Sequence, residues 1–376
     1  MSALVRIASK SPLVVIGQSA RMLAVSAARA GPRLVAIDLF ADSDTREVAR
    51  TIALPSLEEG QVLEALQSVV AECGRSRLVY GSGIDTRPDW VERFSDLVDV
   101  VGNSASVLMR VHSPASFFGL LDSLTIPYPE IRFSRPEDPD AWLFKIPFTE
   151  GGRGVLSEME HPDHAHGYYQ KKLEGPSMSV LFLANREEAF IIGFNTQWTV
   201  GPDAPLPYLF GGIMNTAGLA IQQKIQIGDY VAKLVKSASL AGLNSLDFMI
   251  DGGECRVLEL NPRPSASLIL YDKSFPHGLL AEHIRAVKGL PVRKPNPEGP
   301  GCRGLEIVYV QQPCMIGQAI RWPGWTLDRP MPGTKIAAGE AICTVTAKAT
   351  AGEALRTLLS LRKRKILELI FSERRK

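Results

Sequence analysis

The sequence predicts an α/β protein of two or three domains, and three observations support this prediction. Short apolar segments typical of buried strands alternate with segments of helical pattern from the start of the chain. The 376 residues are 45% hydrophobic, which is enough for a large buried core. A formal net charge of +2 with 22% charged residues gives no reason to expect nucleic acid or a membrane surface as a partner.

Residues 1–111 are expected to form an open α/β domain. Buried strands separated by helices are typical of a parallel sheet with helices on both faces. The strands are expected at 13–16, 34–37 and 78–80, and the helices at 20–30 and 57–72.

A second domain is expected over residues 112–300, with a lid at about 143–185 and a metal-binding part at about 186–300. Its predicted helices cover 116–123 and 227–241, and its predicted strands cover 142–146, 168–172, 180–183 and 189–195. The proline- and glycine-rich stretch 292–301 predicts a connection. A small strand-rich unit with a terminal helix, residues 301–376, is expected to follow it.

The strongest motif lies in a predicted hairpin, residues 248–250 and 256–260, joined through Asp251-Gly252-Gly253. Residues two apart on a strand face the same side, so Glu259 and Asn261 point together, and Asp247 comes alongside from the partner strand. Two carboxylates and an amide oxygen are ligands that Mg²⁺ prefers.

Arg263 follows this set and offers a planar guanidinium to a phosphate or acyl phosphate. Acidic residues beside a hairpin are most often solvated surface groups. The combination of Asp, Glu, Asn and Arg that ends in Asn261-Pro-Arg-Pro favours a functional site instead.

A second motif places Lys145 on a strand, before a loop that contains Gly151, Gly152, Arg153 and Gly154. Glycines let backbone N–H groups approach phosphate oxygens, and a lysine adds a point charge. The spacing does not fit a P-loop, and a flexible hairpin tip is the alternative. A third motif runs from Tyr168 to Val180 and predicts a strand whose backbone groups and one side chain could bind the edge of an adenine. An ordinary edge strand is the alternative for this segment.

Taken in order, these three segments resemble the ATP-grasp superfamily over roughly residues 10–350. The resemblance implies an α/β ATP-grasp fold: an N-terminal open α/β pre-ATP-grasp domain, two α+β ATP-grasp subdomains and a small strand-rich C-terminal unit. It implies that Lys145 and the glycine loop with Arg153 hold the ATP phosphates. The residues that it places at the adenine are Gln170, Lys171, Lys172 and Leu173.

The same resemblance makes Asp247, Glu259 and Asn261 the ligands of one or two magnesium ions, with Mn²⁺ as an expected substitute. It assigns Arg263 and Lys145 to catalysis. One departure is Ser177, which stands where the family often has a ribose-binding glutamate, and this puts the ribose contact in doubt.

The implied activity is that of a ligase. A carboxylate attacks the γ-phosphorus of ATP, and an amine then attacks the acyl phosphate to form an amide. The expected partners are small amino-acid substrates, and a homodimer is an expectation from the family. Five scattered cysteines without a CxxC pair predict reduced thiols in a cytoplasmic protein.

The candidate substrate residues are Asn195, Gln197, Trp198, Tyr208 and Ser265, with a central strand and a packing loop as the alternative for this region. More loosely, the chain is similar to tyramine–glutamate ligases of methanofuran-type biosynthesis and to their bacterial tyrosine–glutamate counterparts. That similarity implies glutamate as the carboxylate and tyrosine or tyramine as the amine, in one-carbon cofactor biosynthesis. Three alternatives stay open: another amino-acid ligase, a carboxylase-like enzyme, and a non-catalytic nucleotide-binding regulator.

Two further features are interpreted as surface. His161, His164 and His166 lack the paired spacing of a zinc site. The basic residues 362–365 and 374–376 fit the solvated face and end of an amphipathic helix in a chain of nearly neutral charge.

Overall fold

The N-terminal part of the chain is an open parallel sheet, as predicted. The computed structural model describes residues 11–157, 166–296 and 301–372. Its first sheet has the strand order β3-β2-β1-β4-β5, with every neighbouring pair parallel. The strands are β1 (Leu13–Ile16), β2 (Leu34–Asp38), β3 (Arg50–Ala53), β4 (Arg77–Tyr80) and β5 (Asp99–Val100). The helices are α1 (Arg21–Ala28), α2 (Ser43–Arg46), α3 (Glu59–Cys73), α4 (Pro88–Leu97) and α5 (Ala105–His112).

Separate apolar cores lie on the two faces of this sheet, because successive residues of its strands point to opposite sides. Val14 and Ile16 pack with α3 and α4, whereas Leu13 and Val15 pack with α1. The chain leaves β1 toward β2 on one side and enters β4 on the other, so the crevice beyond the carboxyl ends of β1 and β4 is a switch point where ligands bind in open α/β sheets.

The centre of the molecule is an eight-stranded sheet with the order β14-β13-β10-β11-β12-β15-β19-β17. All its described pairs are antiparallel. The first five strands along the chain are β10 (Ser177–Asn185), β11 (Ala189–Thr199), β12 (Phe210–Met214), β13 (Ala241–Asp251) and β14 (Glu254–Asn261). The last three are β15 (Cys302–Tyr309), β17 (Thr326–Leu327) and β19 (Ala341–Ala349).

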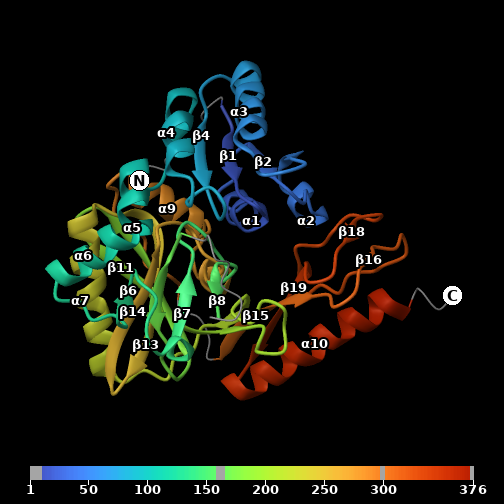
Figure 1. Cartoon of the computed structure of the whole chain (residues 1–376). Coiled ribbons are helices and arrows are strands. Elements are labelled where there is room, and N and C mark those ends of the chain that lie inside the picture. The colour runs from blue at the N-terminus through green and yellow to red at the C-terminus, as the bar shows by residue number, and fades with distance from the viewer. Residues whose placement is uncertain (1–10, 158–165, 297–300, 373–376) are drawn as a thin grey trace.

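Helices pack on both faces of this sheet. The helices α6 (Pro114–Ser123) and α7 (Ile221–Ala238) pack on the face that carries Val180 and Phe182 (Figure 1). The opposite face carries Leu181 and Leu183, which pack with the short helix α8 (Leu268–Tyr271) and with α9 (Leu279–Val287). Further along β10, Ser177 and Ser179 share that second face. The uncovered, polar end of this face is the place where the candidate site lies.

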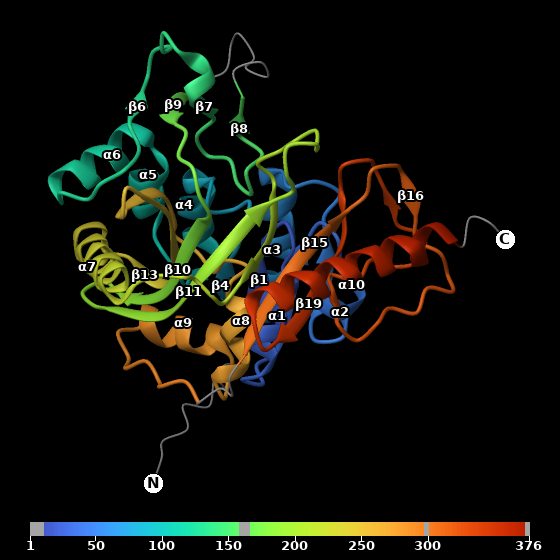
Figure 2. The same cartoon turned by 90° about the horizontal axis from the view of Figure 1, so that it is seen from below.

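A small sheet stands apart from the main body (Figure 2). Its order is β6-β9-β7-β8, with β6 (Ile131–Arg132), β7 (Trp142–Lys145), β8 (Val155–Leu156) and β9 (Tyr168–Lys171). Trp142, Phe144 and Tyr169 form a core of their own on one face. Alternation along β7 and β9 puts Lys145 and Gln170 on the other face.

The C-terminal strands extend the central sheet, because β12 pairs with β15 and β15 pairs with β19. The helix α10 (Gly352–Ser372) packs on β15 and β19, and a two-stranded ribbon, β16 (Cys314–Met315) with β18 (Lys335–Ile336), completes this part (Figure 1). Strands from before and after the predicted boundary near residue 300 therefore belong to the same sheet. The division of the chain at residues 111 and 300 stays a prediction.

The predicted hairpin and the predicted helices are confirmed, with one clear error in position. The long helix begins at Ile221, six residues before the predicted start at 227. Its first turns expose Ile221 and Ile225, so the apolar pattern that marks the buried face begins only later in the sequence. The side chain of Gln223 accepts a hydrogen bond from the N–H of Ala220 at 3.0 Å and caps the true start.

Within the described ranges, no helix combines the length and the apolar character that a membrane span requires. All five cysteines are free thiols.

Candidate active site

Two carboxylates lie directly opposite each other on the β13–β14 hairpin. Asp247 and Glu259 are register partners, and a β-bulge follows Asp247. Asn261 lies two residues beyond Glu259, with its Nδ2 3.4 Å from a Glu259 carboxylate oxygen. Gln197 on β11 donates a hydrogen bond to Asp247 at 3.0 Å. Burial and the neighbouring Glu259 carboxylate raise the pKa of Asp247 to about 8.

This arrangement fits a magnesium ion. The donors that it offers are the carboxylates of Asp247 and Glu259 and the amide oxygen of Asn261. In the part of the chain that the structure describes, no group of three His, Cys, Asp or Glu side chains could hold a metal ion. Mg²⁺ typically takes one or two carboxylates and completes its octahedron with waters and phosphates. A divalent cation would also relieve the repulsion that raises the pKa of Asp247.

Lys145 brings the small sheet to this cluster. Its position at the end of β7 places it on the face of that sheet opposite the aromatic core. Burial lowers the pKa of Lys145, and the carboxylates of Glu259 and Asp247 act in the opposite direction. The lysine is therefore close enough to both carboxylates to interact electrostatically with them, as a residue that holds phosphates beside a metal must be.

The glycine loop is folded down onto the segment that leads into β12. The carbonyl of Gly151 accepts a hydrogen bond from Phe210 N at 2.9 Å. A Cβ on Gly152 would lie 1.9 Å from the carbonyl oxygen of Tyr208, so only glycine permits this approach. Gly154 is packed equally tightly against Thr149, whereas Arg153 is exposed at the tip.

The predicted adenine segment divides into two parts. Gln170 is buried, and its Nε2 has no hydrogen-bond partner among the described residues, so its amide is available to a ligand. Lys171 is exposed beside Glu130, with 3.8 Å between their charged atoms. Lys172 donates from Nζ to the carbonyl of Asp140 at 2.7 Å, and Leu173 is half-buried. The structure thus turns both lysine side chains away from the carboxylate cluster and brings only Gln170 to the inner face.

Two of the predicted substrate residues belong to the polar face. Gln197 links Asp247 to Ser177 and donates to both, at 3.0 Å and 3.1 Å. Asn195 is fully buried and accepts a hydrogen bond from the Tyr271 hydroxyl at 2.7 Å. Gln197 therefore orients a candidate metal ligand, whereas Asn195 is held by its own neighbours.

The other three predicted substrate residues make contacts of a different kind. Trp198 is on the opposite face of β11 from Gln197, and the guanidinium of Arg356 on α10 lies 3.6 Å from its ring centroid. Tyr208 touches the glycine loop through its backbone. Ser265 shares a hydrogen bond of 2.8 Å with Ser267. Trp198 packs in the C-terminal core, because neighbouring residues on a strand face opposite sides.

Three ionisable residues that the sequence motifs did not indicate form a cluster with Arg263. Asp85 follows β4, His112 ends α5, and Glu150 begins the glycine loop. The Nε of Arg263 lies 3.1 Å from a carboxylate oxygen of Asp85, and its Nη2 lies 3.7 Å from Glu150. One indication was present in the sequence: Gly81-Ser-Gly-Ile-Asp85 directly follows a strand of a parallel sheet, where ligand-binding loops occur.

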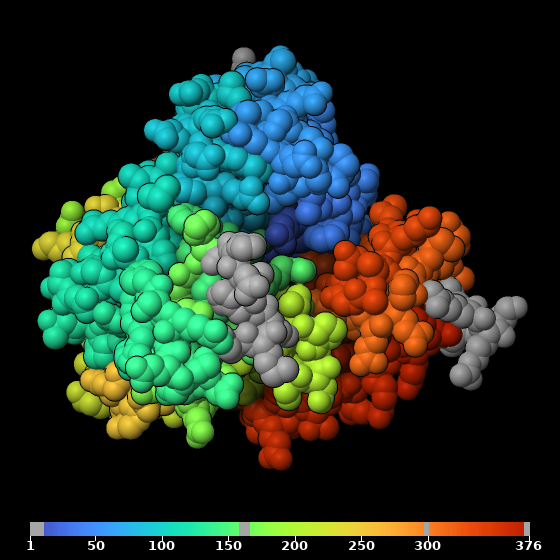
Figure 3. Space-filling model, viewed as in Figure 1, coloured from blue at the N-terminus to red at the C-terminus, as the bar shows by residue number. Residues whose placement is uncertain are grey.

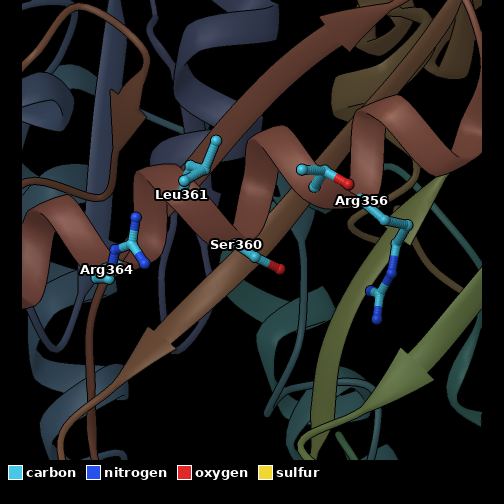
Figure 4. A pocket seen from close by; sticks show the side chains of 5 residues that line it. Arg356, Ser360, Leu361 and Arg364 are labelled. Carbon is cyan, nitrogen blue, oxygen red and sulfur yellow. The ribbon is translucent and has the colours of Figure 1, made fainter.

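The surface is hollowed where the N-terminal domain, the segments near the glycine loop and the C-terminal unit meet (Figure 3). A shallow depression elsewhere lies along α10 and is lined by Arg356, Thr357, Ser360, Leu361 and Arg364 (Figure 4). No member of the carboxylate cluster lines this depression, and it is separate from the candidate site.

The three sheets and the position of this cluster between them define the ATP-grasp fold. Residues 116–267 match the family model described as the ATP-grasp domain. A curated relative is the arginine-specific large chain of carbamoyl phosphate synthase from Bacillus subtilis (strain 168), at 22% identity over 65% of this chain. This chain spans about a quarter of that relative, 25% of its length.

Solved structures with similar folds cover nearly the whole chain. N5-carboxyaminoimidazole ribonucleotide synthetase from Thermus thermophilus has a TM-score of 0.67 and 17% identity, and the match covers 94% of this chain and 98% of that one. L-amino acid ligase from Bacillus licheniformis has a TM-score of 0.67 and 12% identity, with coverage of 93% and 96%. The biotin carboxylase domain of the Hydrogenobacter thermophilus 2-oxoglutarate carboxylase, in complex with MgADP, ADP and bicarbonate, has a TM-score of 0.71 and 14% identity, with coverage of 94% and 89%.

Proposed function

We propose that this protein is an ATP- and magnesium-dependent carboxylate–amine ligase that forms an amide through an acyl phosphate. The observation that carries the proposal is the opposed pair Asp247 and Glu259, which faces Lys145 from the small sheet and lies close to Arg263. One cluster thus combines metal donors, a phosphate-binding cation and a guanidinium, each of which can stabilise the charge of a phosphoryl transfer.

Each residue has a role in this scheme. Lys145 and the backbone amides of the glycine loop hold the phosphates, and Gln170 offers its unpaired amide to the nucleotide. Magnesium, when bound by Asp247, Glu259 and Asn261, neutralises charge on the phosphates. Arg263 stabilises the transferring phosphoryl group, and the folded-down loop keeps water from the acyl phosphate.

For the substrates, we propose that glutamate supplies the carboxylate and that tyrosine or tyramine supplies the amine, in a one-carbon cofactor pathway. The similarity to an L-amino acid ligase supports an amino-acid substrate in general. The similarities to carboxylating enzymes and to carbamoyl phosphate synthase support a second candidate, in which bicarbonate is the carboxylate. A non-catalytic regulator has no need of the full metal-donor set.

The test is phosphate release from ATP and Mg²⁺ with amino acids offered singly and in pairs, and with bicarbonate, together with mass spectrometry of the products. We expect an amide product with glutamate and tyrosine or tyramine, and its loss in Glu259→Gln. Phosphate release with another amino-acid pair would keep the ligase and exclude these substrates. Binding of ATP without turnover under any condition would favour the regulator.

A further inference from the structure

Three elements that are distant in the sequence place charged groups around one guanidinium. Asp85 follows β4 in the N-terminal sheet, Glu150 belongs to the glycine loop, and Arg263 follows the metal hairpin. Their side chains are 1%, 13% and 11% exposed, respectively. A buried cation between two buried carboxylates is costly to assemble unless each charge has a partner. The pairing in this cluster is nevertheless incomplete.

Asp85 uses only one of its two oxygens. Its Oδ2 lies 3.1 Å from Arg263 Nε and 3.4 Å from His112 Nε2. Its Oδ1 is buried and has no hydrogen-bond partner among the residues that the structure describes. Arg263 and His112 keep the pKa of Asp85 low despite burial, so the carboxylate is charged. A buried anionic oxygen without a partner is a site for a cationic donor.

The side-chain carboxylate of Glu150 occupies a position that could bind the carboxylate of a ligand. Its Oε2 accepts a hydrogen bond from the backbone N–H of Gly83 at 2.8 Å and lies 3.7 Å from Arg263 Nη2. A backbone N–H together with a guanidinium is a typical carboxylate receptor. The Oε1 of Glu150 has no described partner, so the receptor holds this loop carboxylate by one oxygen only.

We propose that Arg263 and the Gly83 amide bind the carboxylate of an amino-acid substrate in the place that Glu150 occupies here, and that Asp85 binds the ammonium group of the same molecule. The inference rests on the proposed function and narrows its substrate to a zwitterion. One carboxylate oxygen of Asp85 and one of Glu150 each lie within 4 Å of a guanidinium nitrogen of Arg263, so the two binding places are neighbours that a small amino acid can span.

This assignment separates the two candidate functions. Bicarbonate carries no ammonium group and would leave Oδ1 of Asp85 unpaired, which penalises it relative to an amino acid. The Glu150 side chain covers the receptor until a substrate displaces it, so this side chain and the substrate compete for the same N–H and guanidinium.

The experiment is calorimetric titration of the full chain, with Mg²⁺ and a non-hydrolysable ATP analogue present, against L-glutamate and against its deamino analogue glutarate. Wild type should bind glutamate ~10- to 100-fold more tightly than glutarate, the range that one charged hydrogen bond supplies. Asp85→Asn should weaken glutamate binding by a similar factor and leave glutarate unchanged. The exposed Asp89→Asn on α4 is the matched control and should change neither.

Glu150→Gln should strengthen ligand binding, in contrast to Asp85→Asn, and it tests whether Glu150 competes with the substrate. It keeps the size of the side chain and removes its charge, so both ligands should bind ~3- to 10-fold more tightly, since a charged competitor is lost. Weaker binding of both ligands would show that Glu150 is a structural latch and overturn the assignment. The wild-type comparison of glutamate with glutarate needs no variant and stands even if Asp85→Asn does not fold.

The outcomes also separate this inference from the proposed function. Binding of glutamate with no amide product or phosphate release would refute the ligase and leave the amino-acid site standing. Phosphate release that requires only bicarbonate, with no binding of glutamate or of any other amino acid in a full set, would overturn the site. Equal affinity of wild type for glutamate and glutarate would overturn it as well.

Discussion

Substitution of Gly152 by alanine should disable the glycine loop far more than the same change at Gly151. Both residues have positive φ, 79° and 62°, so each substitution strains the backbone by ~1–2 kcal/mol. Only Gly152 adds a steric clash, because its Cβ would lie 1.9 Å from the Tyr208 carbonyl oxygen, whereas a Cβ on Gly151 meets nothing within 4 Å. The loop of Gly152→Ala must therefore leave its seat.

The expected magnitudes follow from these contacts. Leaving the seat breaks the hydrogen bond of 2.9 Å between Phe210 N and the Gly151 carbonyl, worth ~1 kcal/mol. With the strain and lost packing, the folded-down loop is destabilised by roughly 2–3 kcal/mol in Gly152→Ala and by about 1 kcal/mol in Gly151→Ala. These values correspond to ~30- to 150-fold and ~5-fold less of the folded-down state.

Two assays measure this difference. One is kcat/KM for phosphate release with the substrates identified as above. The other is the rate of tryptic cleavage at Arg153, the exposed residue at the tip of the loop. Gly152→Ala should lower the first and raise the second by roughly 6- to 30-fold more than Gly151→Ala does. Equal effects of the two variants would refute the steric reasoning, since they share the backbone strain and differ only in the clash.

Three other predictions concern the metal site, the adenine face and the response to pH. Glu259→Gln should lower magnesium-dependent turnover at least ~10³-fold, because an absent metal ligand removes much of the charge stabilisation of phosphoryl transfer; the exposed Asp251→Asn on the same hairpin should not. Gln170→Leu should raise the free energy of unfolding by roughly 1–2 kcal/mol in urea titration, since it removes a buried unpaired amide, while it weakens ATP binding in calorimetry; loss of stability would contradict this. Burial lowers the pKa of His283 to about 4, below its ordinary value of about 6.5. Between these two values the unfolded chain binds more protons than the folded chain, so the free energy of unfolding decreases as the pH is lowered from 6.5 to 4. This loss of unfolding free energy should approach roughly 3 kcal/mol at the low end of the range. The difference in unfolding free energy between about pH 7 and about pH 5 should be smaller in His283→Gln than in the control His277→Gln.

The sequence predicted the part of the site that depends on local geometry. Alternation along a strand sufficed to bring Glu259 and Asn261 to one side and Asp247 beside them, and the register confirms this pairing. The same alternation explains why Trp198, which neighbours Gln197, faces the other way, toward Arg356.

What could not be predicted depends on contacts between distant segments. Asp85 and Glu150 meet Arg263 only because the carboxyl end of β4, the glycine loop and the metal hairpin converge in three dimensions. No local pattern fixes which loop reaches which guanidinium. The pairing of β12 with β15 has the same character, since about ninety residues separate Gly212 from Glu306, its register partner.

That pairing has a consequence for any attempt to shorten the protein. Removal of the residues after 300 would leave β12 as a bare sheet edge, with its N–H and C=O groups open to the edge of another molecule and to aggregation. It would also remove the Tyr309 hydroxyl, which donates a hydrogen bond to the Phe210 carbonyl at 2.9 Å. The N–H of the same Phe210 donates to the Gly151 carbonyl of the glycine loop. The segment 116–267 that carries the ATP-grasp match is thus not expected to fold as an independent fragment, and the last fifth of the chain supports the segment on which the glycine loop rests.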